Sequence, residues 1–273
     1  MRESQLKLTI IYIILIIAGV IALFPLYWVI TTSLKLRVDV FKMPPVWFFK
    51  PTFENYRLVL TSRFPGYFLN SLFISAGTLI LSLLIGVPTA YGLAKLKIKK
   101  KKDILFFILS TRMAPPAVFI IPFYFLWSRL HLIDTYIALI IMYQLFTVSF
   151  IVWMMTSFFE EIPREIDEAA WIDGCSKWEC FFKVALPSAS GGLVATMILS
   201  VLLIWNEFFY ALILTAFKTK TMPVALPGYI GFVRMRWGEL SAAATIVVLP
   251  VLIFALIVQK NLVRGLVGSS VKG

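Results

Sequence analysis

An uncharged, mostly apolar run extends from Thr9 to Thr32. As a helix, a run of this length is long enough to cross the hydrocarbon core of a bilayer, which is about 30 Å thick. A cleavable signal peptide is the alternative interpretation, but the run is too long for one and no small-residue cleavage pattern follows it. The run therefore predicts a first transmembrane helix.

Further apolar runs follow along the chain, separated by polar connections. The composition agrees, because 60% hydrophobic residues with only 15% charged residues lies outside the range of soluble proteins. We therefore expect an all-α, multi-pass protein of the cell membrane, in which one transmembrane domain covers residues 1–273 and crosses the lipid bilayer six times. The expected spans cover residues 9–32, 69–94, 104–127, 135–158, 189–217 and 240–258.

Positive charge is concentrated in the short connection after the second span, where Lys95, Lys97 and residues 99–102 lie. Such a cluster favours the cytoplasmic side. Both termini are then expected in the cytoplasm, and the first connection, residues 33–68, is expected outside. That connection carries Lys and Arg residues of its own, so charge alone gives it a conflicting signal.

The chain has 26 Lys and Arg residues against 14 Asp and Glu residues. In a membrane protein this excess indicates basic loops beside anionic lipid, and the chain lacks the interleaved basic and aromatic residues that would predict a nucleic-acid partner. Cys175 and Cys180 lack C-x-x-C spacing and further metal ligands, so we expect them to be small buried packing residues. With His131 as the only histidine, neither a metal site nor a histidine-based catalytic site is expected.

The longest polar interruption runs from Glu160 to Pro187. Pro163 is suited to the first position of a helix, and Gly174 can end that helix in a left-handed conformation. Ser176 followed by Glu179 has capping-box spacing, so a second short helix should begin there and end before the proline that closes the range. The interruption therefore predicts a helix, a glycine turn and another helix.

In the first of these helices, Ile166, Ala169 and Ala170 share one narrow face, with Asp167 and Glu168 on the other side. An amphipathic helix that lies on the membrane with solvated acids is one interpretation. The adjacent alanines also allow another surface to approach the backbone closely. The pattern alone leaves both interpretations open.

The sequence between Glu160 and Pro187 also resembles a family motif. E-A-A at residues 168–170, Gly174 four residues later and then V-A-L-P at residues 184–187 resemble the E-A-A-x-x-x-G and I-x-L-P motif of the membrane subunits of ABC importers, with Val184 where that family commonly has Ile. The resemblance implies the type I permease fold and a cytoplasmic loop, residues 159–188, that docks onto an ATP-hydrolysing subunit. The docking residues that it implies are Glu165, Glu168, Ala169, Ala170, Gly174, Leu186 and Pro187.

Weaker signals point to one subfamily. S-L-K at residues 33–35, P-T-F-E-N-Y at residues 51–56 and W-N-E-F at residues 205–208 resemble carbohydrate permeases of the maltose-transporter type, although an ordinary interfacial loop would also explain the first two. The resemblance implies three partners: an ATP-binding subunit dimer, a second and different permease subunit, and an external solute-binding protein. The chain lacks the G-x-x-x-x-G-K-[ST] motif, so we expect no ATPase site and no cofactor, with ATP and Mg bound by a partner subunit.

Four residues within the expected spans are candidates for a translocation path: Arg112, Gln144, Asn206 and Glu207. A charge in lipid costs at least about 2.5 kcal/mol, so Arg112 is either functional or extends to the headgroups. Gln144 could instead bond a neighbouring helix. Glu207 lies among aromatic residues whose faces could stack on sugar rings, or it could pair with another span.

The connection over residues 218–239 contains Pro223, Pro227 and Gly228. The prolines stiffen this segment, and a plain connector is one interpretation. Its position matches the loop that reaches toward the binding protein's sugar cleft in the maltose-type family. The resemblance therefore implies that these three residues are candidate contacts with a solute-binding protein.

Sequence and resemblance together predict a permease subunit of an ABC importer for a sugar or oligosaccharide. Movement of the ATPase, taken up by residues 165–174, would tilt the spans between inward and outward openings. A permease for another solute, such as glycerol phosphate or a peptide, is the alternative, but a phosphate carrier should place several cations in the membrane and only Arg112 lies there. A channel or a membrane enzyme is a third class, and the spans lack the clustered Asp, His, Ser or Cys residues of an enzyme.

Overall fold

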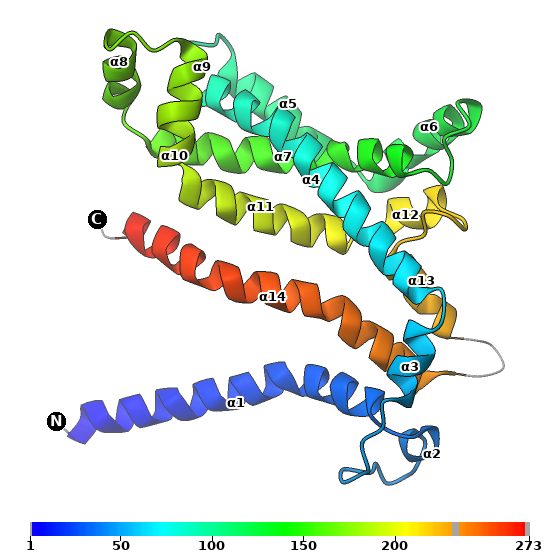
Figure 1. Cartoon of the computed structure of the whole chain (residues 1–273). Helices are drawn as coiled ribbons and strands as arrows, with labels where there is room; N and C mark the ends of the chain where they lie inside the picture. The colour runs from blue at the N-terminus through cyan, green and yellow to red at the C-terminus, as the bar shows by residue number, and fades with distance from the viewer. Residues whose placement is uncertain (1, 231–234, 271–273) are drawn as a thin grey trace. The chain divides into compact units, whose positions relative to one another are not determined.

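The computed structural model describes residues 2–230 and 235–270. Over these residues the chain is helical and has no β-strand, apart from one isolated bridge between Ile230 and Met235. The predicted all-α class is therefore confirmed (Figure 1). Four helices contain segments long and apolar enough to cross a membrane: α1 (Arg2–Ser33), α4 (Phe64–Lys95), α7 (Tyr136–Glu161) and α14 (Trp237–Ser270).

Two further apolar segments are bent. α5 (Lys101–Met113) and α6 (Pro116–Arg129) meet at 84°, so the expected span 104–127 is not one straight helix. Proline disfavours the helical conformation of the residue before it, and Ala114 is extended with ψ 136°. A bend of 78° separates residues 177–188 from α11 (Ser190–Trp205). If each bent pair is one span, the described chain has up to six candidate spans.

The expected span 189–217 is also interrupted. α11 ends at Trp205, and a second helix, α12 (Phe209–Leu214), begins after a short non-helical link. Phe208 marks the restart with φ −119°. The link places Asn206 and Glu207 outside regular helix.

The chain forms two compact units, each built from two segments. Unit 1 contains Met1–Pro65 and Ala225–Leu249, and unit 2 contains Gly66–Val224 and Pro250–Gly273. Besides α1 and the first part of α14, unit 1 holds the short helices α2 (Arg37–Val40) and α3 (Glu54–Leu60) and the 3-10 turn η2 (Leu226–Tyr229).

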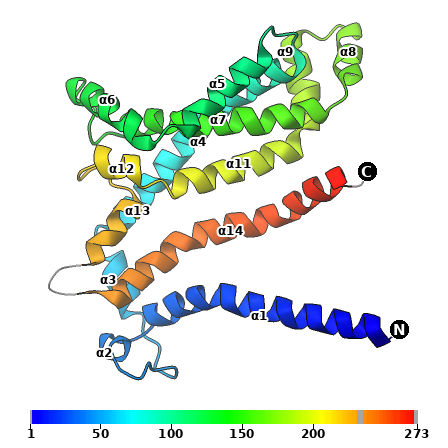
Figure 2. The same cartoon turned by 180° about the vertical axis from the view of Figure 1, so that it is seen from behind.

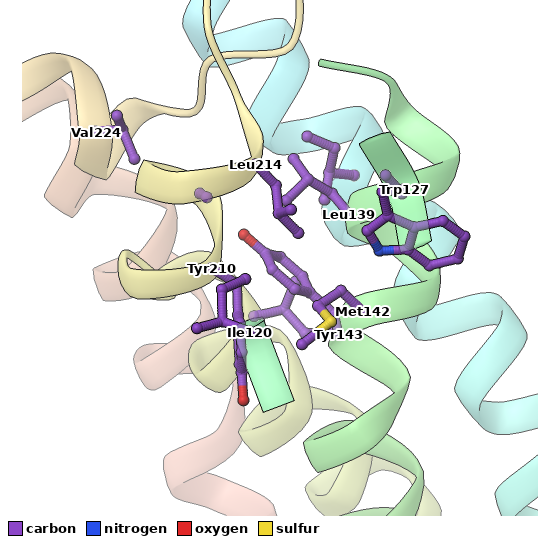
Figure 3. Packing of buried hydrophobic residues seen from close by; sticks show 12 residues of the cluster. Ile120, Trp127, Leu139, Met142, Tyr143, Tyr210, Leu214 and Val224 are labelled. Atoms are coloured by element: carbon purple, nitrogen blue, oxygen red, sulfur yellow. The ribbon is translucent and has the colours of Figure 1, made fainter. Parts of the chain in front are cut away.

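Unit 2 has two buried clusters. α5 and α11 both pack along α7, and α12 packs against α6 and α7 (Figures 1 and 2). Figure 3 shows the first cluster, in which Tyr143 of α7 lies among aliphatic and aromatic side chains from these helices. The second cluster lies where the end of α4 meets the end of α7 and the segment after α9 (Lys177–Cys180). Its largest members are Tyr91, Ile151, Met155, Phe159 and Phe181.

Candidate functional site

The polar segment after α7 folds as the predicted helix, glycine turn and second helix. The first helix, α8 (Arg164–Ile172), begins one residue later than predicted, because Pro163 precedes the helix with an extended ψ of 139°. Gly174 has φ +89°, so the predicted left-handed glycine is confirmed. The Cys175 N–H donates to the Ala170 carbonyl at 3.0 Å and closes the turn. Figure 1 shows α8 and α9 at one end of unit 2.

The second helix starts with the predicted capping box. The Glu179 N–H donates to the Ser176 hydroxyl at 3.3 Å, and the Glu179 carboxylate accepts the Ser176 N–H at 3.0 Å. This N–H and the ammonium of Lys183 lower the pKa of Glu179 to about 2. The carboxylate therefore stays charged at physiological pH and continues to accept the Ser176 N–H that caps the helix.

The second helix is longer than predicted. It continues through a π turn, η1 (Phe181–Ala185), into α10 (Leu186–Ser188), so the prediction that it ends before Pro187 is wrong. The π turn places Pro187 at the start of a new helical turn, where its missing N–H costs little. The chain then bends into α11 directly, without a loop of its own.

α8 has one buried side. Asp167 and Ala170, three residues apart and therefore on one side of the helix, are buried. Ile166, Glu168 and Ala169 are exposed. The predicted common face of Ile166, Ala169 and Ala170 is therefore split, and the prediction of solvated acids is wrong for Asp167.

Asp167 is buried because a cation from another helix meets it. Lys95, the last residue of α4, places its Nζ 2.8 Å from Asp167 Oδ2 and also donates to the Ile162 carbonyl at 2.6 Å. A buried carboxylate and a buried ammonium are tolerated only when they neutralise each other and satisfy their remaining hydrogen bonds. These contacts therefore fix α8, and Ile162 at the end of α7, to the end of α4.

Cys180 extends this buried contact. Its thiol donates to Asp167 Oδ1 at 3.3 Å, and the Tyr91 hydroxyl donates to Cys180 Sγ at 3.6 Å. Burial raises the pKa of Cys180, so the group is a neutral thiol. Cys180 is the predicted buried packing residue with a hydrogen-bond role that the sequence did not reveal, whereas Cys175 is half-buried.

Gln144 bonds a neighbouring helix. Its Oε1 accepts the Ser82 hydroxyl of α4 at 2.6 Å, and its Nε2 donates to the carbonyls of Ile140 (2.8 Å) and Thr78 (3.4 Å). These contacts use both ends of the amide between α4 and α7. Gln144 was predicted either to line the translocation path or to bond a neighbouring helix, and these contacts agree with the second alternative.

The other candidates for a translocation path lie in different surroundings. The carboxylate of Glu207 accepts the N–H groups of Tyr210 (2.8 Å) and Ala211 (3.2 Å), so Glu207 caps the start of α12. Asn206 is exposed and donates to the carbonyl of Leu202 at 2.8 Å. Among the contacts described for residues 2–230, none joins any two of the four candidates.

Arg112 lies in the last turn of α5. Its guanidinium lies 5.1 Å from the ring centroid of Phe150 on α7, and the residue as a whole is exposed. A cation over an aromatic face is stabilised by the ring's negative face. The contact holds the guanidinium of Arg112 against α7, while the residue as a whole stays exposed.

A carboxylate that sequence reasoning missed organises the segment after α12. Asp134 accepts the backbone N–H groups of Ala216, Phe217, Lys218 and Thr219 at 2.9–3.1 Å, and the Thr219 hydroxyl at 2.9 Å. Burial alone would raise the pKa of Asp134, but these donors hold it well below its usual range. Asp134 is a single aspartate before a helix, and no local sequence pattern predicts that it contacts residues 216–219.

Two side chains of α4 hold the same segment. Asn70 donates to the carbonyls of Lys218 (2.8 Å) and Lys220 (3.0 Å), and the Ser71 hydroxyl accepts the Met222 N–H at 2.8 Å. The segment that leads to the predicted proline-rich connection is therefore pinned at residues 216–222.

The candidate contacts with a binding protein follow this pinned segment. Pro223 is half-buried in a short helix, whereas Pro227 and Gly228 are exposed in η2. Residues 231–234 of the predicted connection lie outside the described residues.

The carbohydrate-type motifs of unit 1 are in contact. Asn55 donates to the carbonyls of Ser33 and Lys35, both at 2.9 Å, and the hydroxyls of Tyr56 and Ser33 lie 2.8 Å apart. A Cβ added at Gly238 would lie 2.6 Å from Asn55 Oδ1, so glycine leaves room for this amide. S-L-K and N-Y therefore form one structural element that ends α1.

Comparison with known proteins identifies the family. Residues 82–268, which include α7, α8 and the Gly174 turn, match the family described as "Binding-protein-dependent transport system inner membrane component". The chain belongs to this family. The predicted membrane subunit of an ABC importer is therefore confirmed, and the permease is a multi-pass membrane protein of a system that uses a solute-binding protein.

Relatives match the permease over most of its length. It is 38% identical over 251 residues to the probable ABC transporter permease protein y4oR of Sinorhizobium fredii, covering 92% of this chain and 90% of that protein. It is 32% identical over 278 residues to the trehalose/maltose transport system permease protein MalG of Thermococcus litoralis, covering 100% of both.

A solved structure shares the fold of the permease. The chain matches one chain of a bacterial ABC transporter involved in the import of the acidic polysaccharide alginate with a TM-score of 0.80, covering 95% of this chain and 98% of that one. At 24% identity this likeness concerns the fold alone, and it confirms the predicted permease fold.

Proposed function

We propose that this permease takes up a sugar or oligosaccharide that an external solute-binding protein delivers. The observation that carries the proposal is the match to the trehalose/maltose permease of Thermococcus litoralis, which extends over the whole of both chains. The contact between the S-L-K and N-Y segments supports it, because these are the segments that resemble carbohydrate permeases.

Transport by the assembled importer in liposomes tests the substrate class. With the binding protein outside and ATP inside, we expect accumulation of labelled trehalose or maltose and none of glycerol 3-phosphate or a dipeptide. Uptake of either non-sugar solute, with no sugar taken up, would contradict the proposal.

We also propose that the exposed side of α8 docks onto an ATP-binding subunit, which binds ATP and Mg. Glu165, Glu168 and Ala169 lie on this side, with the side chain of Ile172 largely free at 87% exposed. Ala170 faces inward and supports the helix, and Gly174 sets the angle to α9. Leu186 and Pro187 lie where the second helix bends into α11 and would pass the movement to that span.

The permease would work with a second permease subunit. Residues 9–31 of α1 include no buried residue and expose many large aliphatic side chains. Lipid and a second permease are the two apolar surroundings that suit such a helix. Both subunits would then share one ATP-binding dimer.

The proposed orientation places both termini and residues 159–188 in the cytoplasm. The pairing of Lys101 in the basic connection with Glu160 at the start of the loop supports this orientation, because paired residues would lie on the same side of the membrane. Labelling of Cys175 by a membrane-impermeant thiol reagent, in whole cells and in inverted vesicles, tests this orientation. Labelling in whole cells would contradict it.

For the solute path we propose the exposed candidates Asn206 and Arg112, since Gln144 and Glu207 use their polar atoms within the fold. For the binding protein we propose Pro227 and Gly228, with Pro223 stiffening the segment behind them.

A further inference from the structure

A small polar cavity lies in unit 2 beside the break between α11 and α12. It has about 10 Å³ of room for the centre of a water molecule. This is close to the minimum of about 10–15 Å³ that a protein cavity needs to hold one water. The hydroxyl and carboxyl side chains in its wall are Ser71, Ser75, Tyr143, Glu207 and Thr221.

Two hydroxyl groups in this wall have no hydrogen-bond partner within the described part of the chain: Tyr143 Oη and Thr221 Oγ1. Both residues are more than nine-tenths buried, with 1% of Tyr143 and 4% of Thr221 exposed. Leaving a buried hydroxyl unsatisfied costs about 1–3 kcal/mol. Two such groups around one cavity indicate a small ligand that can both donate and accept hydrogen bonds.

Glu207 supplies a charged acceptor in the same wall. Its carboxylate oxygens accept the N–H groups of Tyr210 and Ala211, and each oxygen retains a second lone pair. The carboxylate lies beside the Tyr143 hydroxyl in this wall. A small guest in the cavity would lie within reach of both groups.

We propose that this cavity binds one ordered water molecule, which links the hydroxyls of Tyr143 and Thr221 to the carboxylate of Glu207. A water can accept from a hydroxyl and donate to a carboxylate, which a metal cation cannot do. An apolar guest would leave both hydroxyls unsatisfied. The other wall groups are neutral, and a single carboxylate that already accepts two N–H groups is a poor cage for a cation.

The position of the site gives the water a structural role. Tyr143 belongs to α7, Glu207 to the break after α11, and Thr221 to the segment that Asp134 and Asn70 pin. One water would therefore connect three parts of the chain at the point where the fifth expected span is interrupted. Glu207 then acts in positioning the interrupted span.

Isosteric variants in the assembled transporter, held in lipid nanodiscs, test the site. Tyr143→Phe and Thr221→Val each remove one hydroxyl and should each lower Tm by roughly 2–4 °C, because the water loses a partner. The double variant should lower Tm by less than the sum, since both hydroxyls hold the same water. Thr78→Val is the matched control, because Thr78 Oγ1 is also buried without a partner among the described residues but does not line this cavity. Its Tm should stay unchanged or rise.

A cryo-EM map of the wild-type transporter that resolves waters gives a readout that needs no variant. Density between Tyr143, Glu207 and Thr221 at hydrogen-bond distances is expected. A map without that density, or Tyr143→Phe and Thr221→Val variants that behave like Thr78→Val, would overturn the proposal. A wild-type Tm that falls when choline replaces sodium would overturn it in favour of a cation.

Discussion

Lys95 at the end of α4 and Asp167 in the middle of α8 form an ion pair of 2.8 Å, with side chains only 2% and 3% exposed. The pair joins the last residue of a membrane-spanning helix to the helix that we propose as the docking element. Because α8 is short, it has little stability of its own and depends on such tertiary contacts. Movement of α8 should therefore be passed to α4 through this pair.

Breaking the pair should detach α8. Asp167→Asn or Lys95→Met leaves one charge buried without its partner, which typically costs about 3–5 kcal/mol. We expect faster amide hydrogen exchange over residues 164–172 and loss of the ATP-binding subunit during purification. Lys183→Met is the control, because the Lys183–Glu179 pair is exposed and should contribute little. Unchanged protection of α8 in Asp167→Asn would show that the pair does not hold the helix.

The adjacent alanines of α8 should respond in opposite ways to the same charge. Ala169 is exposed and Ala170 is buried. Ala169→Asp should therefore leave folding and membrane insertion intact while it abolishes ATPase docking and transport. Ala170→Asp should lower Tm sharply, because a carboxylate would be buried beside Asp167. Equal losses of Tm in both variants, measured in detergent, would contradict this assignment of faces.

Asp134→Asn should release the segment after α12. The carboxylate accepts five hydrogen bonds, and a hydrogen bond to a charged group is worth about 2 kcal/mol. The variant should therefore melt well below the wild type at pH 7, and Asp39→Asn, which removes only the Asp39–Lys42 pair, should not.

The effect of Asp134 should depend on pH in a defined direction. Since the folded protein holds its pKa below the usual value near 3.9, the stabilisation is fully present above that value and is lost as pH falls toward the folded pKa. The difference in Tm between the wild type and Asp134→Asn should therefore shrink below about pH 4. A difference that grows on acidification would rule out this account.

The two glycines at the start of α11 should differ in their tolerance of alanine. A Cβ at Gly192 would lie 2.3 Å from Phe158 Cγ on α7, whereas a Cβ at Gly191 would meet nothing within 4 Å. Gly192→Ala should therefore cost about 1–3 kcal/mol through overpacking between α7 and α11. Gly191→Ala should be neutral or slightly stabilising, because alanine favours the helix. Tm values of the two variants in the same detergent decide between them, and similar values would contradict the close approach of α11 to α7.

Local signals allowed the sequence to predict the fold of residues 160–180 well. The helix ending at Gly174 and the capping box of Ser176 and Glu179 depend on residues only a few positions apart. The end before Pro187 was wrong because a π turn, which proline rules do not foresee, carried the helix past it.

The candidate translocation residues show the opposite case. Gln144 and Glu207 were predicted as path residues because they are polar groups within apolar runs. In the structure, Gln144 forms a hydrogen bond between α7 and α4, and Glu207 caps the start of α12. A polar residue in a span satisfies its hydrogen bonds wherever it can, and the sequence does not reveal which partner is in reach.

The sequence by itself determined that the protein is an all-α membrane protein, that a glycine turn and a capping box follow α7, and that the chain belongs to its family. These properties depend on apolar run length, turn residues and a fixed motif spacing, which all act within short stretches of chain. The tertiary structure alone decided that Asp167 meets Lys95, that Asp134 holds residues 216–219, and that Tyr143 and Thr221 face one cavity. These contacts join residues far apart in the sequence. Their partners are fixed by how the helices pack, which no local pattern encodes.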